Sequence, residues 1–399
     1  EGMYFNNFYP QVSTGTSSDT EFTLNTSLMP ALSGIVFVSY YNREYVTIPK
    51  LLKDKGYYTF SMHANLASMW NRDKMHPSLG YDNFYSSTSF DITDETSVGL
   101  GLTDQEFFTQ AQNILEKIEI ENENYMGTMI QLSNHSPFYA TPNNPEIYDN
   151  YGKLDLTNTY TVMDEETNEP KTVTDNYLEG TKLGNYIKSA HYADMALGEF
   201  FKYVEESPYY EDTVFVLYGD HDAKLNKSEY QYYYNYDKET GKVYEEDDEG
   251  YVDFDDYQQE INRRTPLIIW TKNKDIKKKI NVTNNNVIGM YDILPTLGNM
   301  MNFDSDFALG HDIYDIKDNN IVIFPNANFV TNKIYYNNSN SSYLALGNNI
   351  VLESDYIENC KKYTEERLDV SNNIIVYDLI KRDEEKISVN TNVNEDIKE

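Results

Sequence analysis

A carboxylate and an imidazole stand side by side in this sequence, at Asp220 and His221, directly after an apolar run. The run reads Val-Phe-Val-Leu-Tyr over residues 214–218, which predicts a strand of a parallel sheet that is buried on both faces. In open α/β sheets, chemistry collects beyond the carboxyl ends of the strands. The pair could therefore supply half of a divalent-metal site. A solvated turn is the alternative, because Gly-Asp is common turn chemistry.

Hydroxyl side chains cluster near the start of the chain, in Ser-Thr-Gly-Thr-Ser-Ser-Asp-Thr over residues 13–20. Residues 19–24 could be helical, and Ser, Thr and Asp are favoured at the start of a helix. A hydroxyl there faces unpaired N–H groups and the positive end of the helix dipole, a setting that stabilises an alkoxide or a phosphoryl group. Capping of the helix without any chemistry is the alternative interpretation.

Polar groups also follow two other predicted strands. Residues 57–63 alternate like a strand, and the loop after them carries Trp70 and Arg72. An arginine can bind phosphate through a planar fork, and a tryptophan can cover an apolar or polyol face. The alternatives are core packing for Trp70 and a surface ion pair for Arg72. Residues 125–132 form the next expected strand, and His135 follows it. A lone histidine is more often structural, but a second one at a strand end favours a shared site.

The order of the predicted elements indicates the fold class. Apolar residues recur with helical spacing in residues 46–55, 104–120 and 184–206. Together with the strands, these helices give the order strand, helix, strand, helix. This order predicts an α/β fold, with a central, mostly parallel sheet flanked by helices.

The pattern of the sequence changes after residue 310. Short apolar segments with Asn-rich turns predict an antiparallel meander, and a terminal helix is expected over residues 374–386. We therefore expect a catalytic domain over residues 1–320 and a small α+β subdomain with an antiparallel sheet over residues 321–399. The expected strands of the meander are residues 321–324, 328–330, 333–336, 342–346 and 350–352.

Two long polar segments interrupt these elements. Residues 139–177 are expected to form a surface excursion. Residues 226–259 contain a tyrosine-rich run and then an acidic run, which predicts an exposed, partly mobile insertion. A calcium loop is conceivable there, but the spacing does not match an EF-hand.

The composition narrows the possible partners. The 399 residues carry a formal net charge of −33, which argues against nucleic-acid partners and favours cationic ligands such as divalent metals. It also argues against adhesion of the whole surface to anionic lipid head groups. The single cysteine, Cys360, allows no disulfide within the chain, and no run of 18 apolar residues could span a membrane. Because the sequence opens on Glu1 and shows no signal peptide, we expect an excised extracellular domain whose upstream segment is missing.

Several motifs together resemble the extracellular domain of the lipoteichoic acid synthase family, in the sulfatase-like branch of the alkaline phosphatase superfamily. They follow the family's order and span nearly the whole chain, and the Asp-His and Trp-Asn-Arg motifs together are quite specific. The motifs are Asn7-Phe-Tyr, Gly15-Thr-Ser-Ser-Asp-Thr-Glu-Phe22, Asn25-Thr-Ser-Leu-Met-Pro30, His63-Ala-Asn with Trp70-Asn-Arg-Asp73, Ser133-Asn-His-Ser-Pro-Phe138, Leu217-Tyr-Gly-Asp-His221 and Arg264-Thr-Pro-Leu-Ile-Ile269.

This resemblance implies the residues of an active site. It puts the family's threonine nucleophile at Ser17, with Thr16 as the neighbouring alternative, and it puts metal ligands at Ser17, Asp220 and His221. A further ligand of the family, a glutamate on a strand upstream of the nucleophile, would fall before the first residue of this sequence. The implied substrate-contacting residues are His63, Asn65, Trp70, Arg72 and His135, and Asn65 stands where an aspartate is often found.

The resemblance also implies a reaction. With manganese, or possibly magnesium, as cofactor, phosphatidylglycerol would donate glycerophosphate to Ser17 and release diacylglycerol. A polyglycerophosphate hydroxyl would then take the group from Ser17. Arg72 and His135 would contact phosphate oxygens, and His63 or His135 would protonate the leaving oxygen. The enzyme would work on the extracellular face of the cell membrane of a Gram-positive-type bacterium, attached through the upstream segment.

Two other functions stay open. One is a different enzyme on the same scaffold, such as a phosphoethanolamine transferase, a phosphodiesterase or a sulfatase. The other is a non-catalytic binding module that kept the fold and lost the metal, which the missing upstream glutamate would favour.

Overall fold

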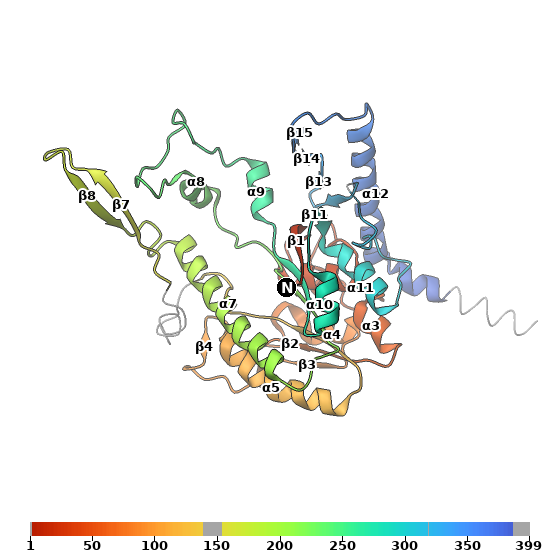
Figure 1. Cartoon of the computed structure of the whole chain (residues 1–399). Coiled ribbons are helices and arrows are strands. Elements are labelled where there is room, and N and C mark those ends of the chain that lie inside the picture. Colours follow the sequence, from red (N-terminus) through yellow and green to blue (C-terminus); the bar gives the residue numbers. More distant parts are fainter. Residues whose placement is uncertain (1, 139–153, 318, 386–399) are drawn as a thin grey trace, which may run out of the picture.

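Two β-sheets lie at the centre of the computed structural model, which describes residues 2–138, 154–317 and 319–385 (Figure 1). The larger sheet has the strand order β11 (Val282–Gly289), β1 (Met3–Tyr9), β10 (Leu267–Thr271) and β9 (Val214–Tyr218). The smaller sheet has the order β3 (Asn83–Tyr85), β2 (Tyr58–Met62) and β6 (Tyr125–Met129).

Three of the five strand pairings described in these two sheets are parallel. Strand β1 runs parallel to β11, and β2 runs parallel to both β3 and β6. Strand β10 is antiparallel to both of its neighbours, β1 and β9. The larger sheet is therefore mixed, with one parallel and two antiparallel pairings, and the parallel majority comes from the smaller sheet. The predicted α/β fold with a central sheet flanked by helices is confirmed.

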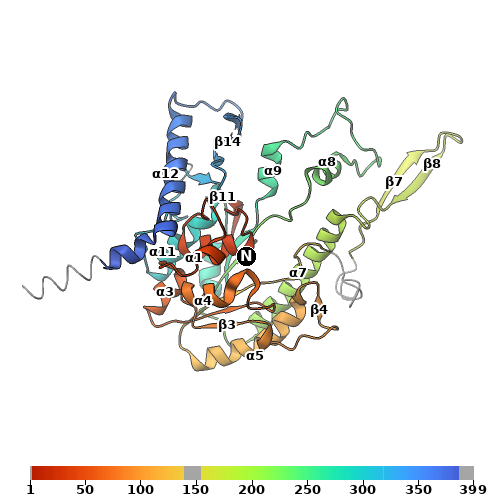
Figure 2. The same ribbon diagram turned by 180° about the vertical axis from the view of Figure 1, so that it is seen from behind.

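Helices cover both faces of the larger sheet (Figures 1 and 2). Val214 and Val216 of β9 pack toward α3 and α11, whereas Phe215 packs toward α5 and α7, as expected for alternate residues of a strand. The helices of this part are α1 (Ser17–Thr26), α2 (Val36–Ser39), α3 (Ile48–Lys53), α4 (Arg72–Leu79), α5 (Asp104–Glu121), α7 (Lys182–Glu206), α10 (Lys274–Ile280) and α11 (Ile293–Met301). Short 3-10 turns cover Met69–Asn71, Ser87–Ser89 and Met290–Asp292, and a small ribbon pairs β4 (Ser97–Val98) with β5 (Gly101–Leu102).

Strand β9 has the predicted bounds but not the predicted environment. It pairs antiparallel with β10, and all five of its residues are half-exposed rather than buried on both faces. The reason is its place in the sheet: in the described part of the chain β9 is the last strand, and an edge strand has a neighbour on one side only.

The C-terminal meander is confirmed for four of its five predicted strands. They form an antiparallel sheet of β12 (Ile321–Ile323), β13 (Phe329–Thr331), β14 (Ile334–Asn337) and β15 (Ser342–Ala345). The fifth prediction was wrong, because residues 350–352 are not a strand. The terminal helix was predicted too short: α12 is Tyr356–Tyr377, and helical turns continue over residues 379–385. Charged residues dominate its first turns, so the apolar spacing there is too sparse to indicate a helix.

The two polar segments contain more structure than the sequence indicated. In the described part of the first, β7 (Asn158–Met163) and β8 (Pro170–Asp175) form a hairpin that projects from the body of the molecule (Figure 1). The insertion contains α8 (Lys227–Asn235) and leads into α9 (Asp256–Asn262). Stacked aromatic rings hold the insertion in place. The ring centres of Tyr236 and Tyr177 are 3.9 Å apart, and those of Tyr230 and Phe254 are 4.9 Å apart.

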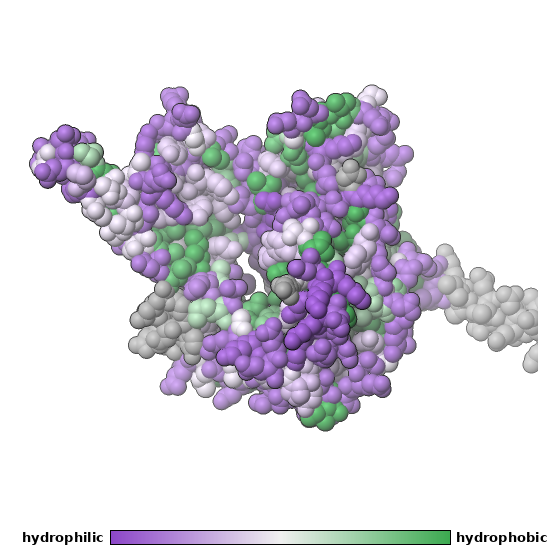
Figure 3. Space-filling view, in the orientation of Figure 1, coloured by the Kyte–Doolittle hydropathy of each residue, from purple (hydrophilic) through white to green (hydrophobic). Residues whose placement is uncertain are grey.

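Most of the face shown in Figure 3 is hydrophilic. Among the described helices, none combines the length and the apolar character needed to cross a membrane.

The two predicted domains share one apolar cluster. Phe22 of α1 and Phe329 of β13 belong to this cluster, together with Leu368 and Ile375 of α12. The Ser371 hydroxyl also donates to the Met29 carbonyl and accepts from the Met29 N–H, at 2.9 Å each. The boundary at residue 320 stays a prediction, but this packing couples the meander and α12 to the helix that begins at Ser17.

We expect Ile375→Ala to destabilise the whole protein. Ile375 is fully buried in the shared cluster, so its truncation should cost about 2–5 kcal/mol of unfolding free energy. The control is Val370→Ala on the same helix, where the side chain is 47% exposed and the cost should stay within about 0.5 kcal/mol. Denaturant unfolding should show one transition for both variants. A separate early transition in Ile375→Ala would mean that the C-terminal part unfolds independently.

Candidate active site

Ser17 is the first residue of α1, a helix whose ten residues are all buried. Thr16 precedes it with a positive φ of 48° and is only half-buried. The carboxylate of Asp19 holds the turn in place, because it accepts from the N–H groups of Ser13 and Gly15 at 2.9 and 3.0 Å. A Cβ on Gly15 would lie 2.2 Å from Asp19 Oδ1, so this close approach requires glycine. The predicted hydroxyl at a helix start is therefore present, at the positive end of the helix dipole.

The loop after β9 brings an imidazole to this hydroxyl. Ser17 Oγ and His221 Nε2 are 3.2 Å apart, and Asp220 Oδ2 lies 3.5 Å from the same nitrogen. His221 Nδ1–H donates to the Asp222 carbonyl at 2.7 Å. Because a carbonyl only accepts, this bond places the lone pair of a neutral His221 on Nε2, facing Ser17. Thr20 Oγ1 donates to the Asp220 carbonyl at 2.5 Å and ties the loop to α1.

These three side chains fit a divalent cation in donor type and spacing. A hydroxyl, a carboxylate and an imidazole suit manganese or magnesium, which prefer oxygen donors and accept imidazole. Two ligands at about 2.1 Å from one cation lie about 3.0 Å apart at a right angle and about 3.4 Å apart at a tetrahedral angle. The Ser17–His221 separation of 3.2 Å falls in this range, and the Asp220–His221 separation of 3.5 Å lies just above it. Within the described residues, no three His, Cys, Asp or Glu side chains form a metal site, so a site here would need the hydroxyl of Ser17 beside Asp220 and His221.

A buried ion cluster lies one helical turn from Ser17. The Glu21 carboxylate accepts from Arg72 Nε at 3.0 and 3.2 Å and from Arg72 Nη2 at 2.6 Å. Its second oxygen lies 2.8 Å from His76 Nε2, and the Ser61 hydroxyl lies 2.8 Å from His76 Nδ1. Burial alone would raise the pKa of Glu21, but Arg72 and His76 outweigh it and lower this pKa to about 2. The alternative of a surface ion pair for Arg72 is thus wrong: the arginine is 2% exposed and paired with a buried glutamate.

His63 and Asn65 are buried next to this cluster, at 3% and 4% exposure. His63 Nδ1–H donates to the Ile130 carbonyl at 3.0 Å. Burial, with a further contribution from the positive charge of Arg72, lowers the pKa of His63 to about 4, so the ring is neutral at pH 7. The Asn65 side-chain oxygen accepts from the Leu66 N–H at 2.6 Å. Trp70 is half-buried against the apolar cluster around Phe22, in agreement with the alternative of core packing. Its backbone has a positive φ of 55°, which is unfavourable for a bulky residue.

His135 stands apart from these groups. It is exposed, and its Nδ1–H donates to the neighbouring Ser136 carbonyl at 2.7 Å. No contact between described residues joins it to Ser17 or His221. The start of its loop is fixed, because Asp104 at the beginning of α5 accepts from the N–H groups of Leu132 and Ser133 at 2.8 and 2.9 Å.

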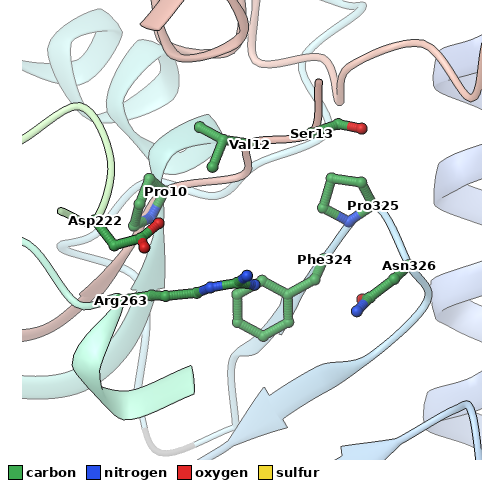
Figure 4. Close-up of a pocket in the computed structure, with 8 residues that line it drawn as sticks. All are labelled: Pro10, Val12, Ser13, Asp222, Arg263, Phe324, Pro325 and Asn326. Carbon is green, nitrogen blue, oxygen red and sulfur yellow. The ribbon is translucent and has the colours of Figure 1, made fainter. Parts of the chain in front are cut away.

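A pocket of about 200 Å³ opens beside the His221 loop (Figure 4). Asp222 and Arg263 line one side of it, and the loop after β12 lines the other. Arg263 extends toward Phe324, and its guanidinium is paired with Glu260 at 2.8 Å. Because Asp222 and Glu260 offset the charge of Arg263, this pocket has no excess of positive charge.

The sequence profile of one protein family, Sulfatase, matches residues 1–303. The chain belongs to the sulfatase family. The sulfatase-like branch expected from the motifs is thereby confirmed. The sulfatase-like fold is confirmed by a solved structure, the lipoteichoic acid synthase LtaP from Listeria monocytogenes, which has 26% sequence identity and a TM-score of 0.73 and covers 94% of this chain and 84% of that chain.

Curated relatives of this sulfatase-family chain have similar names. Lipoteichoic acid synthase 1 of Bacillus subtilis is 28% identical over 383 residues, which are 95% of this chain and 52% of that protein. Lipoteichoic acid synthase of Staphylococcus aureus is 29% identical over 385 residues, which are 95% of this chain and 52% of that protein. The chain thus spans about half the length of the curated relatives that it matches. A protein of the alkaline phosphatase superfamily from Vibrio parahaemolyticus shares the fold, with a TM-score of 0.62 at 18% identity over 94% of this chain and 79% of that one.

Sequence reasoning did not find Glu21, His76 or Asp104 in this sulfatase-family chain. Glu21 gave one local signal, since it lies four residues after Ser17 and so on the same face of the helix. His76 and Asp104 gave none, because their partners are distant in the sequence.

We expect Glu21→Gln to remove several kcal/mol of stability in a pH-dependent way. The variant leaves Arg72 buried without a full counter-charge, which should cost about 3–5 kcal/mol at pH 7. A carboxyl whose pKa is lowered in the folded state contributes stability above its unfolded value of 4.5 and loses it toward its folded value of about 2. Urea unfolding between pH 7 and pH 2 should therefore show the two proteins converging as the pH falls.

The matched control is Glu44→Gln, which breaks a partly exposed ion pair with Lys50 and should cost less than about 1 kcal/mol. A pH-independent difference between Glu21→Gln and the parent would contradict the lowered pKa.

Proposed function

We propose that this chain is the catalytic domain of a metal-dependent phosphotransferase. It transfers glycerophosphate from phosphatidylglycerol to a growing polyglycerophosphate chain through a covalent intermediate on Ser17. One observation carries the proposal: Ser17 Oγ, at the start of a buried helix, lies 3.2 Å from an imidazole nitrogen that presents its lone pair. The names of the relatives support the choice of substrate.

Ser17, Asp220 and His221 would hold the metal, which is manganese or magnesium. When bound, the metal favours the alkoxide of a serine and neutralises phosphate oxygens. The residues around Ser17 and His221 align these two side chains. Thr20 and the Asp222 carbonyl fix the His221 loop, and the turn held by Asp19 fixes Ser17. The helix dipole of α1 adds favourable electrostatics for an anion at Ser17.

The head group of the lipid would lie against Arg72, His63, Asn65 and Trp70, with His135 approaching from its exposed loop. His63 is a poor proton donor at pH 7, because its pKa is about 4 and its Nδ1–H is bonded to a carbonyl. His135 is solvent-exposed and is the better candidate to protonate the leaving oxygen. Because phosphatidylglycerol is a membrane lipid, we propose that the full-length protein works at the extracellular face of the cell membrane of a Gram-positive-type bacterium.

We expect Ser17→Ala to abolish release of diacylglycerol from a fluorescent phosphatidylglycerol by the full-length protein. The only side-chain hydrogen bond described for Ser17 is to His221, so its loss should change the unfolding free energy by less than about 1 kcal/mol. Thr16→Ala is the control, and it should keep most of the activity. If Thr16→Ala is inactive and Ser17→Ala remains active, the nucleophile is Thr16.

We expect Asp220→Asn and His221→Ala each to lower the amount of manganese or magnesium bound by the full-length protein, since each removes a ligand. Elemental analysis after gel filtration measures this directly and needs no turnover. The neighbouring Asp222→Asn is the control, because its side chain bonds the Lys224 N–H rather than facing Ser17. Unchanged metal in both ligand variants would favour a simple turn at residues 219–222.

A further inference from the structure

Glu21 has no role in the proposed reaction, yet it lies one helical turn from the nucleophile. Residues four apart on a helix share a face, with Cβ atoms about 6 Å apart. Helical side chains also lean toward the N-terminal end of their helix, so the Glu21 carboxylate lies over the turn that begins with Ser17. Any group bound by Glu21 is therefore held near Ser17.

Glu21 binds one edge of the Arg72 guanidinium and makes no hydrogen bond to Nη1 on the other edge. Its oxygens accept from Nε and Nη2 at 2.6 to 3.2 Å, whereas Nη1 is not among the nitrogens that it binds. A guanidinium is planar, so fixing Nε and Nη2 also fixes the direction in which Nη1 points. With Arg72 2% exposed and Glu21 7% exposed, this orientation is defined by burial as well as by charge.

Glu21 is itself held from a second direction. His76 of α4 binds its other oxygen at 2.8 Å, and Ser61 of β2 lies 2.8 Å from the far nitrogen of that ring. Aromatic rings enclose His76, with Phe84 at 4.5 Å and Tyr81 at 5.3 Å between ring centres. The carboxylate thus has one position, set by α1, α4 and β2 together.

We infer that Glu21 is the positioning residue of the active site, which aims the free edge of Arg72 at the phosphate bound to Ser17. This inference rests on the proposed function and adds a residue to it. An ion pair that served only to stabilise the fold would tolerate any geometry that keeps the two charges together. A positioning pair would not, because a misplacement of about 1 Å can cost about 100-fold in rate.

Glu21→Asp separates the two roles. Aspartate keeps the buried charge pair but withdraws the carboxylate by one methylene, so Arg72 is drawn back with it. We expect kcat/KM for diacylglycerol release to fall about 10- to 150-fold, the range expected for loss of one charge-assisted contact. The assay is run far below the melting temperature of each variant, so that the protein is fully folded. Full activity of Glu21→Asp would overturn the inference.

A double-mutant cycle tests whether Glu21 acts through Arg72. In the Arg72→Lys background the fork is already lost, so adding Glu21→Asp should lower kcat/KM by no more than about twofold. Losses that multiply would mean that Glu21 acts independently of Arg72, which contradicts the inference. Glu44→Asp, in the ion pair with Lys50, is the matched control and should keep the parent activity.

Two readouts do not depend on turnover, and the second uses only the parent protein. Inorganic vanadate, an analogue of the transferred phosphoryl group, should bind the parent protein and bind Glu21→Asp at least about 10-fold more weakly by calorimetry. In the parent protein, nitrogen NMR of the arginine side chains should show shifts at Arg72 Nη1 on vanadate addition and none at Nε. A shift at Nε would show that Glu21 does not fix the guanidinium. If the parent protein binds vanadate in this way but releases no diacylglycerol, the proposed substrate is wrong and the positioning role stands.

Discussion

The ion cluster of Glu21, Arg72 and His76 is the interaction on which the rest of the site depends. A carboxylate in a protein interior is costly unless it is paired and hydrogen-bonded, and Glu21 lies inside a helix that is buried from end to end. Arg72 and His76 meet this requirement from a single short helix, α4. Pairing of Glu21 therefore links α1 to α4 one helical turn from Ser17. The proposed nucleophile lies beside a buried charge that this link holds in place.

Backbone carbonyls decide what His221 and His63 can do. The Asp222 and Ile130 carbonyls each accept from an Nδ1–H, in His221 and in His63. Each ring then presents a lone pair on Nε2, which can bind a metal or accept a proton but cannot donate one. The low pKa of His63, about 4, reinforces this state. Acid catalysis in the proposed reaction would therefore come from another group, and the exposed His135 is the candidate.

The sequence predicted the elements whose signal is local. Strand β9 has the predicted bounds, and α5 and α7 agree within two residues at each end, because apolar spacing reports on one element at a time. The half-exposure of β9 was not predictable, since burial depends on which strand lies beside it. The partners of Glu21 were hidden for the same reason, because Arg72 and His76 lie 51 and 55 residues away. The pairing of Ser17 with His221, 204 residues apart, was reached only through a family resemblance.

Because β9 lies at a sheet edge, the loop that carries Asp220 and His221 depends on α1 to hold it in place. Asp220 and His221 follow a strand that has one described neighbour, β10, so the sheet alone holds their loop weakly. The buried Thr20 supplies the missing restraint by donating to the Asp220 carbonyl. Ser17 and Thr20 lie three residues apart on one helix face, so the same turn of α1 carries the hydroxyl and anchors its partners.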